Sequence, residues 1–250
     1  MVSVEEKQLP VRLKEDAILE ALIDIRFQSE DLPEVVLGRL SDNDMWRGYK
    51  RVRNPVADIP APIRDGDANL KYTPVFEYVS PDGQVIFKFN HNMISFHNTR
   101  KYYGWAEFSS HVFSLLEVLF QRLDGVIVNR LGLRYINCLD DRHFIHSVND
   151  LNIDVLVKGQ ALASDFNVNY LDQAHDDCNA MVRVASPNFI DGKLPSNSLA
   201  FFDIDVFSKR GKVFKNKKDC VDWIEKGHLK EKEVFFGLLP KDVIEKLRSE

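Results

Sequence analysis

Residues 130–137 read RLGLRYIN, a stretch in which two arginines flank a glycine inside an otherwise apolar run. Side chains alternate between the two faces of an extended strand. The two leucines and the tyrosine therefore share an apolar face, whereas Arg130, Gly132 and Arg134 share the opposite face with Ile136. We expect a strand with one buried face. Its second face is either exposed to solvent or part of a binding site.

A second stretch near the start of the chain has the same pattern. Residues 17–27, AILEALIDIRF, alternate between apolar and polar side chains and predict another strand with one buried side. Its segment LIDIRF aligns with RLGLRY at an offset of 108 residues, so that Arg26 matches Arg134. The shared pattern indicates an internal duplication.

The order of the remaining elements is also similar in the two halves of the chain. The sequence predicts helices over 32–40, 107–125 (capped by Gly125), 146–156, 218–239 and 242–247, hairpins over 76–90 and 165–186, strands over 91–99, 126–138 and 199–209, and an irregular segment over 41–72. We therefore expect an α+β fold made of a duplicated β-α-β(3–4)-α unit. Residues 1–125 and 126–250 form the two repeats, and they pack as one globular unit. Each repeat contributes an antiparallel sheet packed on a long helix, an architecture similar to TATA-binding-protein-like or helix-grip-like folds.

Composition indicates an ordinary globular protein. Of 250 residues, 44% are hydrophobic and 28% are charged, and the net charge of −5 argues against non-specific binding to nucleic acid. Three cysteines without a CxxC pair favour reduced thiols. The N-terminal stretch is not of signal-peptide type, and no apolar run reaches the ~18–20 residues of a spanning helix. We expect a cytoplasmic protein with no membrane partner.

Three stretches resemble a sporadically distributed family of uncharacterised bacterial proteins of about this length. They are EALIDIRF, GLRYIN, and the C-terminal helix with Phe235 and Phe236 before LLPKDV. The family has no assigned activity, so the resemblance implies no catalytic residue. Its patchy distribution implies a mobile accessory locus, such as a phage-defence or toxin–antitoxin cassette.

The polar face of the two matching strands is the main candidate site. Arg26, Arg130 and Arg134 share an outward register with four acidic residues, Glu20, Asp24, Asp203 and Asp205. One interpretation is a ladder of cross-strand ion pairs, each worth roughly 0.2–1 kcal/mol. The other is a groove in which arginine forks hold a carboxylate, a phosphate or an acidic partner segment.

Two neighbouring residues complete this list of ligand- or partner-binding candidates. Gly132 favours a groove, because a glycine within a strand often marks the close approach of another group. Asn137 ends the same stretch.

Metal chemistry has weaker support. Asp203 and Asp205 are two residues apart on one strand face, a spacing that can share a divalent ion, but no phosphate-binding loop accompanies them. The histidines within 140–146 and 175–178 lack the paired spacing of a zinc site. His228 lies with Glu231 on an apolar helix stripe, which predicts a core hydrogen bond, a helix break at Gly227 or a pocket wall.

The sequence favours a non-enzymatic binding or regulatory protein without a cofactor. Its expected partner is a small anionic ligand or another protein, and a homodimer is compatible with the pattern. One alternative is a metal-dependent enzyme acting on a phosphate-containing substrate through Asp203 and Asp205. Another is a nucleic-acid-binding protein that uses the basic run 209–219, where six of eleven residues are Lys or Arg.

Overall fold

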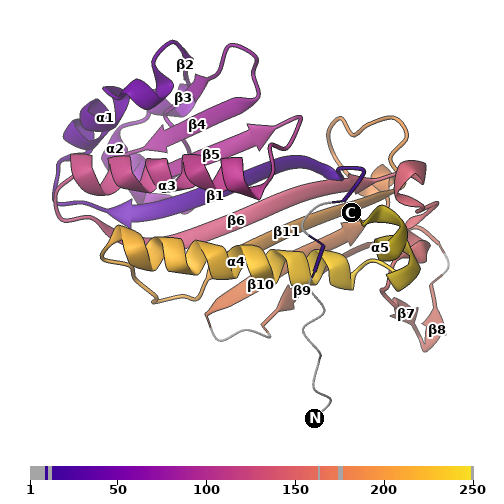
Figure 1. Cartoon of the computed structure of the whole chain (residues 1–250). Helices are drawn as coiled ribbons and strands as arrows, with labels where there is room; N and C mark the ends of the chain where they lie inside the picture. Colours follow the sequence, from indigo (N-terminus) through magenta and orange to yellow (C-terminus); the bar gives the residue numbers. More distant parts are fainter. Residues whose placement is uncertain (1–8, 11–12, 163, 174–176, 249–250) are drawn as a thin grey trace.

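The computed structural model describes residues 9–10, 13–162, 164–173 and 177–248. Its frame is a nine-stranded antiparallel sheet in the order β2-β3-β4-β5-β1-β6-β11-β10-β9 (Figure 1). The strands are β1 (Ile18–Gln28), β2 (Lys50–Arg53), β3 (Phe76–Val79), β4 (Val85–Asn90), β5 (Met93–Thr99), β6 (Ile127–Leu139), β9 (Asn167–Asp172), β10 (Cys178–Ala185) and β11 (Ala200–Ser208). Strands β7 (Leu156–Val157) and β8 (Gln160–Ala161) form a separate small hairpin. The helices are α1 (Pro33–Ser41), α2 (Ala61–Gly66), α3 (Trp105–Arg122), α4 (Lys217–Gly237) and α5 (Lys241–Leu247).

The two long helices, α3 and α4, lie across the same face of the sheet (Figure 1). We call this face the helical face and the opposite one the outer face. On β6, Leu131, Leu133 and Tyr135 are at most 1% exposed and belong to the core, as their alternation predicts. Each fully buried side chain of this size contributes about 1.5–3 kcal/mol, and these contacts hold the helices on the sheet.

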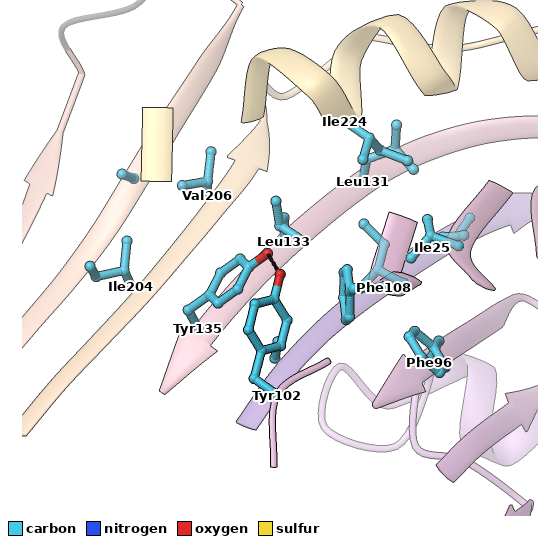
Figure 2. Packing of buried hydrophobic residues seen from close by; sticks show 14 of the residues in the cluster. Ile25, Phe96, Tyr102, Phe108, Leu131, Leu133, Tyr135, Ile204, Val206 and Ile224 are labelled. Atoms are coloured by element: carbon cyan, nitrogen blue, oxygen red, sulfur yellow. Dashed lines mark hydrogen bonds between the residues drawn. The ribbon is translucent and has the colours of Figure 1, made fainter. Parts of the chain in front are cut away.

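Helix α3 buries one apolar side against the sheet because its Phe, Val and Leu residues recur every three or four positions. Phe108 packs on Phe96 of β5, with ring centroids 5.1 Å apart, and both belong to the cluster drawn in Figure 2. Helix α4 begins after Asn216, whose side chain accepts a hydrogen bond from the backbone N–H of Asp219. Its residue Ile224 is fully buried in the same cluster.

The two opening strands, β1 and β6, are antiparallel neighbours at the centre of the sheet. Asp24 lies opposite Gly132, the residue 108 positions further along the chain. Ile23 lies opposite Leu133, and Ile25 opposite Leu131. Of the positions matched by the offset, Asp24 and Gly132 face each other directly, whereas Ile23 faces the match of Ile25 and Ile25 faces the match of Ile23. The register is therefore symmetric about a local two-fold axis at the Asp24–Gly132 pair.

The coarse expectation is confirmed: the protein is α+β, with a large antiparallel sheet covered by helices. The prediction that segment 41–72 is irregular is partly wrong, because the segment contains β2 and α2. The helix expected over 146–156 is wrong: this region forms a 3-10 turn over Val148–Asp150, where Ser147 and Asp150 make reciprocal capping hydrogen bonds, and then enters β7. Gly125 does not cap α3, which ends at Arg122; it adopts a φ of +60° in the turn before β6.

Candidate functional site

The outer face carries the predicted charged residues, and the structure joins them in pairs. Arg134 Nε donates to Asp203 Oδ1 at 2.6 Å, and its Nη2 donates in parallel to Oδ2. The guanidinium of Arg130 lies between two carboxylates, with Nη1 2.8 Å from Asp24 and Nη2 3.2 Å from Asp205. These contacts form a ladder of ion pairs across β1, β6 and β11.

The third arginine is also engaged. Arg26 Nε donates to Asp24 Oδ1 at 2.9 Å, and its guanidinium lies 4.3 Å from the ring centroid of Tyr72. The carboxylate of Asp24 on β1 therefore accepts hydrogen bonds from two arginines. The predicted anion-binding role of this face remains a prediction, and the ion pairs give the same residues a structural role.

The close approach expected at Gly132 is made by a side chain of its own strand. A Cβ atom at residue 132 would overlap the guanidinium of Arg130. Gly132 leaves room for this group to lie flat between Asp24 and Asp205. The glycine is explained by the ion-pair ladder without any ligand.

Burial and hydrogen bonding shift the pKa values of two groups in the ladder. Burial is the largest influence on Asp205 and raises its pKa, although Arg130 and Arg134 act in the opposite direction. For Arg134, the hydrogen bond to Asp203 is the main cause of a raised pKa.

The remaining sequence candidates have partners of their own. His143 Nδ1 lies 2.9 Å from Asp140 Oδ1 in a capped 3-10 turn. In the second histidine cluster, His175 and Asp176 lie outside the described residues. Among the residues that are described, no group of three or more His, Cys, Asp or Glu could hold a metal ion. The basic run is partly paired as well: Lys212 Nζ is 2.7 Å from Asp177 Oδ1, and Lys217 pairs with Glu117.

Asn137, His228 and Glu231 meet on the helical face. All three line a cavity of about 410 Å³, which we call the inner pocket, bounded by the start of α3, the last turns of α4 and the ends of β1 and β6. Asn137 is 1% exposed and does not lie with the arginines on the outer face. Helix α4 runs without a break through Gly227. Of the three roles open to His228 and Glu231, the structure therefore supports a pocket wall.

A second hollow lies at the β2 edge of the sheet and was missed by the sequence patterns. Arg51 and Arg53 of β2 and Arg64 of α2 line a cleft of about 690 Å³, which we call the arginine cleft. Arg51 and Arg53 are two residues apart and share one strand face. None of the described residues that line the cleft is acidic.

Arg64 is the least usual member of the arginine cleft. It is 5% exposed, and its Nη1 donates to Asn90 Oδ1 at 3.3 Å, but its Nε has no hydrogen-bond partner. Within the described part of the chain, no carboxylate lies in ion-pair distance of it. Arg53 pairs with the exposed Asp58 at 2.6 Å, and Arg51 lies 4.5 Å from the ring centroid of Phe76.

No protein-family model, curated protein or solved structure matches this chain. Across the described residues, no helix combines the length and the apolar composition required to cross a bilayer. The functional conclusion therefore rests on the geometry of the two hollows and the outer face.

Proposed function

We propose that the protein is a non-enzymatic binding protein that recognises an acidic ligand, and that the ligand binds in the arginine cleft. The observation that carries the proposal is a buried guanidinium, that of Arg64, in a hollow that contains three arginines and no acidic lining residue. Burying a charge without a counter-ion costs several kcal/mol. An anionic ligand would remove much of that cost.

The shape and charge of the cleft indicate the chemistry of this ligand. A guanidinium presents parallel N–H donors that match the oxygens of a carboxylate or a phosphate. Arg51 lies over the Phe76 ring, and none of the described carboxylates pairs with it, so its donors are open to a ligand. Arg53 would have to share its charge with Asp58. The arrangement suits a small ligand with two or more negative charges.

Thermal unfolding tests this proposal. Phosphate, succinate and chloride are compared at constant ionic strength, so that general screening is the same in each series. A ligand that binds only the folded state at 100 times its Kd adds about 2.7 kcal/mol to its stability. We expect phosphate or succinate to raise the Tm of the wild type relative to chloride, and the better of the two anions to identify the ligand group.

The matched variants are R51Q, inside the cleft, and R47Q, an exposed arginine that does not line it. R51Q should lose most of the anion-dependent rise in Tm, whereas R47Q should keep it. Equal Tm values in all three salts, or an unchanged response in R51Q, would exclude the cleft as the site of an acidic ligand.

We also propose that the chain contains the duplicated β-α-β(3–4)-α unit of TATA-binding-protein-like folds. The local two-fold axis at Asp24 and Gly132 supports this, as does the position of α3 and α4 on one face. Membership of the sporadically distributed bacterial family, and a role in a mobile defence locus, remain proposals based on the stretches EALIDIRF and GLRYIN.

The alternative functions lack a specific structural observation in their favour. Asp203 and Asp205, the suggested metal ligands, already bind Arg134 and Arg130. Flat Mg²⁺ and Mn²⁺ titrations would exclude the metal-dependent enzyme. Absent or salt-independent binding would exclude recognition of nucleic acid through 209–219.

A further inference from the structure

The inner pocket is a second hollow with a chemistry unlike that of the arginine cleft. Its volume of about 410 Å³ lies in the range of sites that enclose small molecules. Aromatic side chains supply much of its wall: Tyr102, Tyr103, Trp105, Tyr135, Phe235 and Phe236. Such a wall suits a ligand with an apolar body.

Two polar side-chain groups of this pocket have no hydrogen-bond partner among the described residues: the carboxyl group of Glu231 and the buried Nδ1 of His228. Glu231 lines the cavity from α4 and is 5% exposed. No hydrogen bond or ion pair connects its carboxyl group to any other described residue. Burial raises its pKa to about 8, so this carboxyl group is mostly neutral at pH 7. A buried acid without a partner is costly, and a ligand with a complementary group would satisfy it.

The His228 ring and two tyrosine hydroxyl groups make contacts within the wall. The His228 ring stacks on Trp105, with centroids 3.7 Å apart and planes 9° apart. Burial lowers the pKa of His228 to about 3, which keeps this ring neutral. The hydroxyl groups of Tyr102 and Tyr135 lie 3.2 Å apart and share a hydrogen bond (Figure 2).

The charges around the cavity decide which ligand charge fits. Among the described residues that line it, the charged or titratable groups apart from the tyrosines and neutral His228 are Asp16 before β1 and Glu231 and Lys232 on α4. With Glu231 neutral, Asp16 and Lys232 balance. If Glu231 ionises, the wall carries one net negative charge. A ligand with one positive charge then restores neutrality, whereas an anionic ligand would leave a negative charge in an apolar pocket.

We propose that the inner pocket binds an organic monocation, an aromatic or aliphatic amine whose ammonium group pairs with the Glu231 carboxylate while its apolar body contacts the aromatic wall. The faces of tyrosine and tryptophan rings attract cations, and this attraction increases when the site is desolvated. Trp105 is held in place in this wall, because its Nε1 donates to Glu225 at 3.3 Å and its ring is stacked on His228.

Binding of this kind moves a proton. The amine enters as an ammonium ion, the neutral carboxyl of Glu231 loses its proton to the buffer, and the resulting carboxylate pairs with the ligand. Because a carboxyl of pKa about 8 is about 90% protonated at pH 7, we expect the release of about 0.9 proton per ligand bound. A neutral ligand would release none.

Calorimetric titration of the full chain with three probes of one skeleton tests the proposal. The probes are 2-naphthylmethylamine, 2-naphthylmethanol and 2-naphthoate, titrated at pH 7 in PIPES and in ACES, whose ionisation enthalpies differ. We expect the amine to bind at least tenfold more tightly than the alcohol and to release about 0.9 proton. The acid should bind most weakly.

Two variants on the same helix assign the effect. E231Q should weaken binding of the amine at least tenfold and abolish proton release, with little change for the alcohol, whose affinity also shows that the variant is folded. E233Q, at an exposed position, should behave as wild type. Binding of the alcohol or the acid as tightly as the amine, retention of amine affinity in E231Q, or no binding of any probe would overturn the proposal. None of these results bears on the arginine cleft.

Discussion

The guanidinium of Arg130 lies over Gly132, two residues along the same strand, in the space that a Cβ atom would fill. This position lets it contact Asp24 on one neighbouring strand and Asp205 on the other. The glycine therefore leaves room for a contact within the protein.

We expect G132A to destabilise the fold by up to about 1 kcal/mol, because the added methyl group makes the flexible end of Arg130 move and weakens its ion pairs with both carboxylates. Urea denaturation measures the change. The control is G38A within α1, where a Cβ meets no atom within 4 Å. It should stabilise the protein by about 0.5–1 kcal/mol, since alanine is the better helix residue. If G132A is as stable as wild type, the packing of Arg130 is not the reason for the glycine.

The parallel hydrogen bonds between Arg134 and Asp203 should appear as an energetic coupling. In a double-mutant cycle with R134A and D203A, we expect about 0.5–1 kcal/mol, because Asp203 is well buried whereas Arg134 is 41% exposed and partly screened. The much more exposed pair Arg47 and Asp44 should show no measurable coupling. Equal coupling in both pairs would contradict a structural ladder on the outer face.

Glu231 should make stability fall as pH rises. Its carboxyl stays protonated in the folded state up to about pH 8 but ionises near 4.5 when unfolded. The stability that Glu231 contributes is therefore fully present below pH 4.5 and is lost progressively up to about pH 8. The pKa difference corresponds to about 5 kcal/mol. His228 has the opposite effect, because its lowered pKa makes stability fall as the pH drops below 6.5. The test is therefore the difference in stability between wild type and E231Q, since both proteins contain His228 and its contribution is the same in each.

We expect the stability of E231Q relative to wild type to increase by several kcal/mol between pH 5 and pH 8, as measured by urea denaturation at each pH. E233Q serves as the control and should follow wild type. A constant difference between E231Q and wild type across this range would show that Glu231 is already ionised in the folded protein.

Replacement of Arg64 tests whether its charge is compensated by the protein alone. R64M removes a buried charge and keeps most of the side-chain volume. In chloride buffer we expect its stability to equal or exceed that of wild type by up to about 1–4 kcal/mol, as found when poorly compensated buried charges are replaced by apolar groups. The stabilising effect of phosphate or succinate should disappear. A loss above 2 kcal/mol in chloride would mean that Asn90 and the surrounding residues already satisfy Arg64.

The sequence was most informative where a repeating pattern reflects burial. The alternation in RLGLRYIN and AILEALIDIRF locates β6 and β1, and the polar positions of these strands do form the ladder that alternation allows. The arginine cleft was missed because β2 is only four residues long and reads KRVR, with no apolar alternation to mark it. Arg64 is eleven residues beyond that strand, and only the folded chain brings it to the same hollow.

The inner pocket was predictable in part. A polar pair at His228 and Glu231 on an apolar helix stripe indicated a core contact, a helix break or a pocket wall. Which of these three roles applies depends on Trp105, which belongs to helix α3 and stacks on His228 of α4. Sequence spacing within α4 carries no information about that partner. Gly132 is a similar case, since a glycine indicates close approach but not which group approaches.

The central pairing of β1 with β6 has a consequence for how the chain folds. Asp24 and Gly132 are 108 residues apart, yet their strands are direct neighbours. Closing a loop of this length costs entropy before the contact is made, and sheets built from distant segments form slowly. Residues 1–125 alone would lack β6, the strand that pairs with one edge of β1. We therefore expect the halves to fold in a single slow transition, with the joining of β1 to β6 as its late step.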